Sequence, residues 1–191
     1  MLLLKWIEQY KIKRHVARLK KRMKDRLGND CYIPLNCRLI GLDLMTIGDS
    51  FYAYDDLRIE VFNLEGRVEK AQLQIGDNVA VGKYCHIGVI NKVIIGNDVL
   101  MGSNVLITDH MHGEGKKEDI ILPPNKRPLF SKGPVIIEDC VFIGDGVKIM
   151  PDVRIGKNAI IGANSVITHD VPAYSVVAGN PAHIIRKGTE N

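Results

Sequence analysis

Residues 135–171 read VIIEDCVFIGDGVKIMPDVRIGKNAIIGANSVITHDV and carry an isoleucine at every sixth position from Ile137 to Ile167. A second small or apolar residue stands two positions before most of these isoleucines, which is the alternation of a short strand. A six-residue period does not match the 3.6-residue turn of a helix, in which each glycine of the stretch would also cost about 1 kcal/mol. The stretch therefore predicts a series of short strands joined by turns.

Turn-forming residues recur where each strand would end. Glycine follows the aliphatic residue in many hexads, and two positions further on stand Asn78, Asp98, Asn104, Gly146, Asp152, Asn158, Asn164 and Asp170. Glycine, asparagine and aspartate adopt a left-handed backbone at the least cost. Three strands and three such turns close a triangular coil, and stacked coils share one aliphatic core. The predicted fold class is an all-β solenoid, a parallel β-helix of hexapeptide repeats.

The repeat also defines the domain boundaries. It runs from Ile75 to Ile107 with one two-residue slip, and a weaker pattern before it indicates less regular early coils. The hexads stop over residues 108–134, a polar, Gly- and Pro-rich excursion of the kind that often carries function. We expect an N-terminal segment at 1–30, a solenoid at 31–178 that includes the excursion, and a tail or short helix at 179–191.

Charge is concentrated at the N-terminus. The 191-residue chain has a net charge of +4, but residues 1–30 hold ten Lys/Arg against three Asp/Glu, so the remainder is net acidic and gives no reason to expect nucleic-acid binding. Apolar residues at helical spacing, from Ile12 to Leu27, predict an amphipathic helix over this basic segment. Such a helix would either cap the open end of the solenoid or make a peripheral contact with an anionic membrane.

The cysteine spacing and the length of the apolar runs indicate in which cellular compartment the protein is expected. The four cysteines form no C-x-x-C pair, which argues against a zinc clip or a redox site and favours a reducing cytoplasm. No run reaches the roughly 18 apolar residues that span a bilayer, and the short apolar start is a poor signal peptide. We expect a cytoplasmic protein, at the inner face of the membrane if its helix binds lipid.

Four motifs together resemble the left-handed β-helix acetyltransferases. They are the hexads, the loop start TDHMHG at 108–113, the return SKGPVIIED at 131–139 and the tail VAGNPA at 177–182. The branch that looks most similar contains the galactoside, maltose and nodulation-factor acetyltransferases and the O-acetyltransferases of bacterial surface polysaccharides. The left hand is implied by this resemblance, which covers residues 70–187, and not by the period. The resemblance also implies a homotrimer that transfers acetyl from acetyl-CoA, held between subunits, to a sugar or glycan hydroxyl.

The same resemblance implies site residues. The general base would be His110, with His112 as the rival, while Asp109 would either orient the imidazole or merely begin the loop turn. The cofactor would run beside Phe142, Gly144, Gly162, Ala163, Thr168 and His169, with its phosphates near Arg186 and Lys187. Three positions depart from the branch: His169 stands where Lys is frequent, His183 stands where Arg is frequent, and Phe142 replaces a frequent Trp, which keeps an apolar wall but loses the indole donor.

The implied reaction needs a base and no covalent enzyme intermediate. An alcohol has too high a pKa to attack a thioester unaided, so a group that titrates near neutrality must take its proton as the C–O bond forms. A backbone N–H from a coil corner would stabilise the tetrahedral oxyanion. The cysteines need not react and no metal is expected; Cys85 occupies a core position.

Other functions use the same solenoid. N-acetylation of an amino sugar would need the same base and cofactor. Zinc-dependent carbonic anhydrases and non-catalytic subunits also have this architecture, and a zinc site would need three converging histidines. His86, His110 and His112 are available in number, but their spacing does not resemble that branch. We expect His86 to be an outward-facing surface or interface residue.

Overall fold

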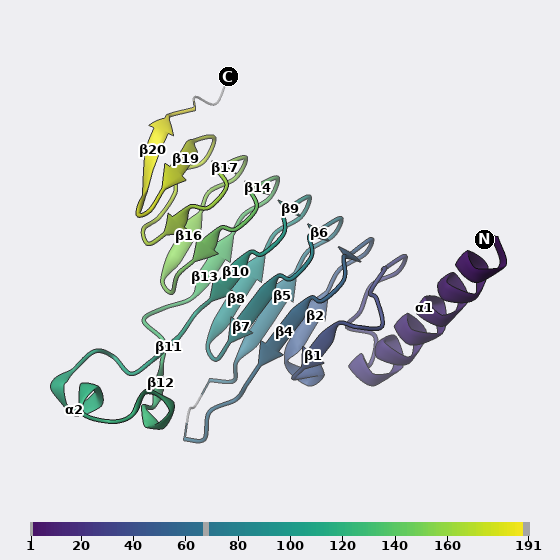
Figure 1. The fold of residues 1–191 in the computed structure, drawn as a ribbon, viewed down its shortest axis with the longest axis horizontal. Coiled ribbons are helices and arrows are strands. Elements are labelled where there is room, and N and C mark those ends of the chain that lie inside the picture. The colour runs from purple at the N-terminus through teal and green to yellow at the C-terminus, as the bar shows by residue number, and fades with distance from the viewer. Residues whose placement is uncertain (1, 67–68, 189–191) are drawn as a thin grey trace.

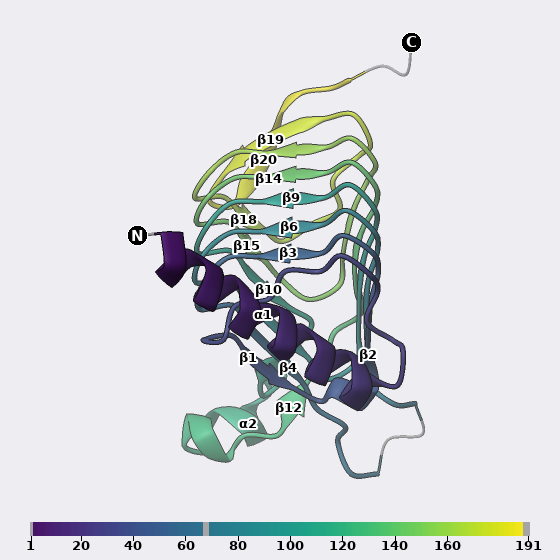
Figure 2. The ribbon, with the colours of Figure 1, turned by 90° about the vertical axis from the view of Figure 1, so that its right-hand side faces the viewer.

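The computed structural model describes residues 2–66 and 69–188. The chain winds through three parallel sheets that we label A, B and C, in that order within each coil, so that the stack is triangular in cross-section (Figures 1 and 2). Helix α1 (Leu2–Met23) and strand β20 (Ala182–Arg186) lie at opposite ends of the stack. The predicted hexapeptide β-helix is confirmed.

The strands of the solenoid are short and belong to the three sheets in rotation as far as β18. Sheet A holds β2 (Met45–Ile47), β5 (Gln72–Ile75), β8 (Lys92–Ile95), β13 (Val135–Ile137) and β16 (Val153–Ile155). Sheet B holds β3 (Tyr52–Ala53), β6 (Ala80–Val81), β9 (Leu100–Met101), β14 (Phe142–Ile143), β17 (Ile160–Ile161), β19 (Val176–Gly179) and β20. Sheet C holds β1 (Arg38–Ile40), β4 (Arg58–Val61), β7 (His86–Val89), β10 (Leu106–Thr108), β15 (Lys148–Ile149) and β18 (Val166–Ile167).

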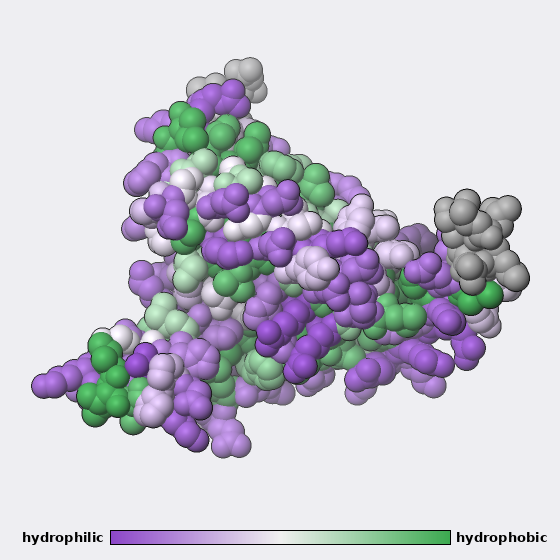
Figure 3. Space-filling view, in the orientation of Figure 1, coloured by the Kyte–Doolittle hydropathy of each residue, from purple (hydrophilic) through white to green (hydrophobic). Residues whose placement is uncertain are grey.

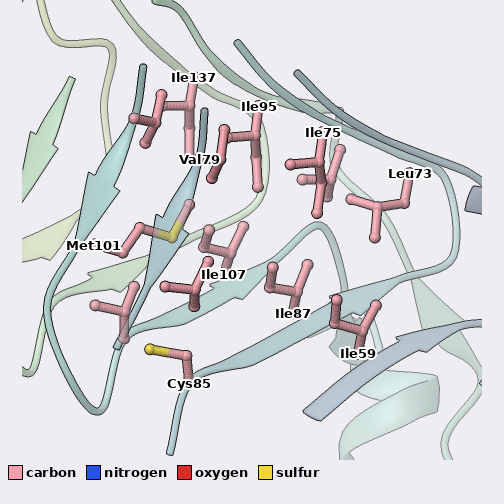
Figure 4. Packing of buried hydrophobic residues seen from close by; sticks show 14 of the residues in the cluster. Ile59, Leu73, Ile75, Val79, Cys85, Ile87, Ile95, Met101, Ile107 and Ile137 are labelled. Atoms are coloured by element: carbon pink, nitrogen blue, oxygen red, sulfur yellow. The ribbon is translucent and has the colours of Figure 1, made fainter. Parts of the chain in front are cut away.

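The core consists of aliphatic columns along the stack. In sheet C, Ile59 is in register with Ile87, and Ile87 with Ile107; sheet A forms a matching column of Ile75, Ile95 and Ile137 (Figure 4). These isoleucines are at most 3% exposed. Burying an isoleucine side chain stabilises a fold by about 1.5–3 kcal/mol. The repeated column therefore explains both the period in the sequence and the stability of the stack.

Most left-handed corners carry the predicted residue types. The backbone φ is positive at Asn78, Asp98, Asn104, Gly146, Asp152, Asn158 and Asn164, as predicted, and also at Tyr84 and Cys140. The prediction is wrong for Asp170, because the last corner is shorter and the Asp170 carboxylate instead accepts a hydrogen bond from the Arg154 N–H at 2.7 Å. The left-handed residue in that coil is Tyr174.

Only one corner of the triangle varies in length. Six residues separate successive core positions from sheet A to B and from B to C, as from Ile95 to Met101 and Ile107. The corner from sheet C back to sheet A, here the C–A corner, is longer in the early coils: it adds two residues between Ile87 and Ile95 and carries the long excursion between Ile107 and Ile137.

The ends of the solenoid differ from each other. Leu19 and Met23 of α1 are buried against the first coil, and a bridge joins Leu27 to Ile47, so the helix covers the N-terminal end of the core. At the other end, where a tail or short helix was predicted, β20 pairs antiparallel with β19. Short helices complete the chain: η1 (Leu42–Leu44), α2 (Lys117–Ile120) and η2 (Pro124–Lys126). None of the helices in the described ranges has the length and apolar character that crossing a bilayer requires.

Candidate active site

The excursion leaves the stack immediately after β10 and is ordered by its own hydrogen bonds. It forms a hairpin of β11 (Met111–His112) and β12 (Leu129–Phe130), beyond which lie α2 and η2. Arg127 closes the tip by donating from Nε to the Leu122 carbonyl at 3.0 Å and from a terminal nitrogen to the Ile120 carbonyl at 3.2 Å. Exposed apolar side chains gather at this tip, over α2 (Figure 3).

Asp109 ties the base of the excursion to the preceding coil. Its carboxylate is fully buried and accepts hydrogen bonds from two backbone N–H groups, that of Ile90 at 2.9 Å on Oδ1 and that of Asn91 at 2.8 Å on Oδ2. Ile90 and Asn91 form the widened C–A corner of the coil below. Two backbone donors on one carboxylate provide the pairing that a buried charge requires.

The same carboxylate fixes His110. Its Oδ1 lies 3.0 Å from Nδ1 of His110, and the Thr108 hydroxyl is 3.3 Å from that nitrogen. Thr108 Oγ1 also donates to the His110 carbonyl at 3.0 Å, which holds the backbone of the turn. Hydrogen bonding to an ionised carboxylate assigns the ring proton to Nδ1, so the Nε2 lone pair is available to accept a proton. His110 thus has an oriented imidazole, and its side chain is 18% exposed.

Gly88 of β7 provides the space that the His110 ring occupies. A Cβ at this position would lie 3.1 Å from His110 Cε1 and 3.6 Å from His86 Nε2. The two imidazoles therefore converge on the outer face of sheet C above a residue without a side chain. His86 faces outward, as predicted, and its neighbour across the glycine is the candidate base.

A group of charged side chains continues from His86 along sheet C. Glu60 lies beneath Arg38 and Arg58: its side chain is 7% exposed, Oε1 is 3.0 Å from Arg38 Nε, and Oε2 is 2.6 Å from a terminal nitrogen of Arg58. The hydrogen bond from Arg58 holds the pKa of the Glu60 carboxyl below its ordinary value, although burial acts in the opposite direction. Burial lowers the pKa of His86, and the nearby Arg58 lowers it further, so His86 is neutral at pH 7.

Sequence reasoning did not identify Arg38, Arg58, Glu60 or Gly88. A signal for them exists, because Arg38, Arg58 and His86 occupy the same outward position of successive coils and are in register on sheet C. The irregular spacing of the early coils, which includes an insertion after β4, conceals that alignment in the sequence. In the sequence Gly88 looks like any other glycine that follows an isoleucine of the repeat. Only the structure shows that the absence of a side chain at Gly88 leaves space for the His110 ring.

The predicted cofactor residues are divided between the two edges of sheet C. Thr168 and His169 lie on the C–A corner two coils beyond Thr108, with Thr168 Oγ1 and His169 Nδ1 2.9 Å apart. Phe142 exposes its ring on sheet B, and the next corner holds Gly144, Gly162 and Ala163. Arg186 and Lys187 are exposed at the end of β20. One chain therefore places His110 on one edge of the sheet and the Phe142 group on the other.

The rival base and the metal alternative can be compared directly. His112 lies on β11, opposite Leu129, with an exposed side chain. Across residues 2–66 and 69–188, no group of three or more His, Cys, Asp or Glu side chains is arranged to hold a metal ion. His86 and His110 converge, but His112 does not join them.

Comparisons with known proteins agree with this architecture. A family model described as "Bacterial transferase hexapeptide (six repeats)" matches residues 134–169. The chain is 36% identical, over 163 residues and 80% of both chains, to the Escherichia coli (strain K12) protein named "Putative lipopolysaccharide biosynthesis O-acetyl transferase WbbJ".

Solved structures with low sequence identity share the fold. One is a mutant of AntD, an N-acyltransferase from Bacillus cereus crystallised with dTDP-4-amino-4,6-dideoxyglucose and coenzyme A; it has a TM-score of 0.69 at 16% identity over 86% of this chain and 84% of its own. Another is a maltose O-acetyltransferase from Clostridium difficile 630, with a TM-score of 0.51 at 23% identity over 95% of this chain and 88% of its own. At such identities the likeness extends to the fold, the left-handed β-helix.

Proposed function

Because this chain belongs to the bacterial hexapeptide-repeat transferases, we propose that it transfers an acetyl group from acetyl-CoA to a hydroxyl of a bacterial surface glycan or of its sugar precursor. The O-acetyl transferase name of the 36% identical relative supports the reaction class, and lipopolysaccharide in that name supports a glycan acceptor. The structural observation that carries the proposal is the Asp109–His110 pair, a base with a fixed tautomer on an otherwise rigid scaffold.

In this mechanism His110 Nε2 accepts the proton of the acceptor hydroxyl while the hydroxyl oxygen attacks the thioester carbon. The imidazolium that forms is stabilised by Asp109 through Nδ1–H. The tetrahedral intermediate then collapses, the C–S bond breaks, and the imidazolium returns its proton to the departing CoA sulfur. The ester remains on the sugar, and no acyl-enzyme is formed.

We further propose a homotrimer with acetyl-CoA between subunits. A row of residues in register crosses the outer face of sheet B, and Tyr52, Leu100, Phe142 and Ile160 expose 39–50% of their surface there. Such a row suits burial against another copy. Association would also bring the Phe142 edge of one subunit toward the His110 edge of the next, which would assemble from two chains the residues that one chain keeps apart.

The reaction belongs on the cytoplasmic side, where acyl-CoA is available. The N-terminal helix turns Ile12, Leu19 and Met23 toward the solenoid, while Trp6, Tyr10 and most Lys/Arg side chains between Lys11 and Arg22 remain exposed. This exposed basic surface would suit contact with an anionic membrane that carries lipid-linked glycan precursors.

The test is release of free thiol from acetyl-CoA with a panel of acceptors that includes hydroxyl-only sugars and amino sugars. His110→Ala should lower kcat by roughly 100- to 10,000-fold, the usual worth of a positioned base, with little change in acetyl-CoA affinity. His112→Ala is the matched control and should be much milder. Near-normal turnover by His110→Ala, or a dead His112→Ala enzyme, would reject this assignment, and transfer restricted to amino sugars would make the protein an N-acetyltransferase.

A further inference from the structure

The charged group beside His110 is organised like a receptor for an anion. Arg38 and Arg58 come from adjacent strands of sheet C, and the single buried carboxylate of Glu60 engages one edge of each guanidinium. Each arginine uses Nε or one terminal nitrogen in this contact, and the arginine side chains remain 65% and 51% exposed. Guanidinium N–H groups that are held in position but still face solvent are the donors that bind phosphate and carboxylate with geometric specificity.

The net charge of the group also favours an anion. Two arginines and one glutamate give a net charge of +1, and the neighbouring His86 is neutral. This positive site lies on a body, residues 31–191, whose total charge is negative. The net charge of the solenoid body therefore gives no general attraction for anions, and outside the basic N-terminal segment an anion would depend on local groups such as these two guanidinium groups.

The position of the group connects it to the reaction. His86 is in register with Arg58, and its Nε2 lies 3.6 Å from Glu60 Oε2, too long for a hydrogen bond. On the other side, His86 and His110 converge above Gly88. Arg58 is thus separated from the proposed base by one side chain, His86, and Arg38 lies one coil further along the same outer face of sheet C.

We propose that the acceptor is anionic: a phosphate or carboxylate of the sugar binds Arg38 and Arg58, and this contact directs a hydroxyl of the same sugar to His110. This inference rests on the proposed function, whose acceptor it places in the class of acidic or phosphorylated sugars. Glu60 acts as a positioning residue that fixes the two guanidinium groups, while His86 fills the space between the anion and the base.

The first experiment measures binding without turnover. Glucose, glucose 1-phosphate and glucuronate are each titrated by calorimetry into the full-length protein saturated with CoA. The phosphate and the carboxylate should bind at least tenfold more tightly than glucose, and the double variant Arg38→Gln/Arg58→Gln should lose about 10- to 100-fold of that affinity, as expected for charge-assisted hydrogen bonds. The difference between the two anions identifies which oxyanion the site prefers.

Arg154→Gln is the matched control. Arg154 also pairs with a glutamate, Glu138, across neighbouring coils, but on sheet A and away from His110. The Arg154→Gln variant should bind glucose, glucose 1-phosphate and glucuronate with the affinities of the unaltered protein. Equal affinities for glucose and its anionic derivatives, or an Arg38→Gln/Arg58→Gln protein that binds them unchanged, would overturn the inference.

Kinetics separate this inference from the proposed function. In the thiol-release assay the double variant should raise KM for anionic acceptors by about 10- to 100-fold and change kcat by less than about threefold. Efficient, arginine-independent acetylation of neutral sugars would keep the reaction and reject the anion site. Arginine-dependent binding of glucose 1-phosphate without His110-dependent thiol release from any acceptor would keep the anion site and reject the reaction.

Discussion

Asp109 uses one carboxylate to join the loop to the scaffold and to orient His110, the proposed base. Its oxygens hold the Ile90 and Asn91 N–H groups and face His110 Nδ1 at the same time. The alternatives that the sequence left open, orientation of the imidazole or formation of the turn, are therefore not exclusive. A fully buried carboxylate in this position makes the geometry of the base depend directly on the backbone of the preceding coil.

Asp109→Asn should lower kcat by roughly 10- to 100-fold, because an amide presents an NH2 group where the carboxylate accepts hydrogen bonds. It should also lower the free energy of unfolding by about 1–3 kcal/mol, measured by urea denaturation. KM for acetyl-CoA should stay nearly constant. Asp139→Asn is the control, since Asp139 accepts a corner N–H from Asn97 at 2.7 Å on another corner; it should leave kcat unchanged. A kcat within twofold of normal in Asp109→Asn would reject the orienting role.

Gly88→Ala should reduce kcat by about tenfold or more, because the added methyl group would meet the His110 ring at 3.1 Å and displace it. This loss of kcat should depend on the presence of the His110 imidazole. In a protein that already carries His110→Ala, the same change should cause no further loss of rate. Independent, additive effects of the two substitutions on thiol release would show that Gly88 acts on something other than His110.

Helix α1 lies outside the hexapeptide repeat and covers the N-terminal end of the solenoid core. A β-helix exposes the edge of its core at each end, and here Leu19 and Met23 lie on that edge. The described apolar face of the helix is consequently occupied by the solenoid. Among the helix residues whose side chains are described, a membrane contact would therefore use the opposite, basic face.

Met23→Ala should destabilise the protein by about 2–4 kcal/mol, since Met23 is fully buried and truncation leaves a cavity at the end of the core. The measurement is the midpoint of urea unfolding at fixed protein concentration. Lys21→Ala, at an exposed site on the same helix, should change stability by less than about 0.5 kcal/mol. Similar midpoints for both variants would show that the helix does not cap the core.

The strands and most corners were predictable because each hexad repeats the same local pattern, in which an aliphatic residue faces the core and a turn-forming residue stands at the corner. The excursion was visible as an interruption of that pattern, and His110 was identified there by resemblance. The contact between Asp109 and the Ile90–Asn91 corner was not predictable, since it depends on how two irregular segments meet in space. The Arg38–Glu60–Arg58 group was missed for the same reason: unequal coil lengths hide which outward residues are neighbours.

At the scale of the molecule, the outer faces of the three sheets are not equivalent. Sheet C carries the charged group and His110, whereas sheet B carries the exposed row that includes Leu100 and Ile160. An exposed apolar row on a regular sheet is costly to leave in water. Its burial between copies would at once remove that cost and form the cleft in which we place acetyl-CoA.

Leu100→Lys combined with Ile160→Lys should therefore shift the protein from trimer to monomer in light scattering and abolish thiol release. Charged side chains in the centre of an apolar interface lack partners and oppose association. Ile136→Lys introduces the same chemistry on the outer face of sheet A and should leave the mass and activity of the oligomer unchanged. An unaltered protein that is active as a monomer would refute the assembly.

The variable C–A corner has a consequence for how such a protein can diversify. Two of the three corners keep a constant six-residue spacing. The strands therefore pair in the same way whatever the length of the segment inserted at the third corner. The full coil from Asn97 to Asp139 spans 42 residues where the preceding coil, from Asp77 to Asn97, spans 20, yet in both pairs a backbone N–H donates to a side-chain oxygen one coil away. The coils thus act as a scaffold for the excursion: segments between Gly113 and Pro128 could be exchanged between chains while Asp109 and His110 are kept, and a library of such exchanges would test new acceptors on an unaltered solenoid.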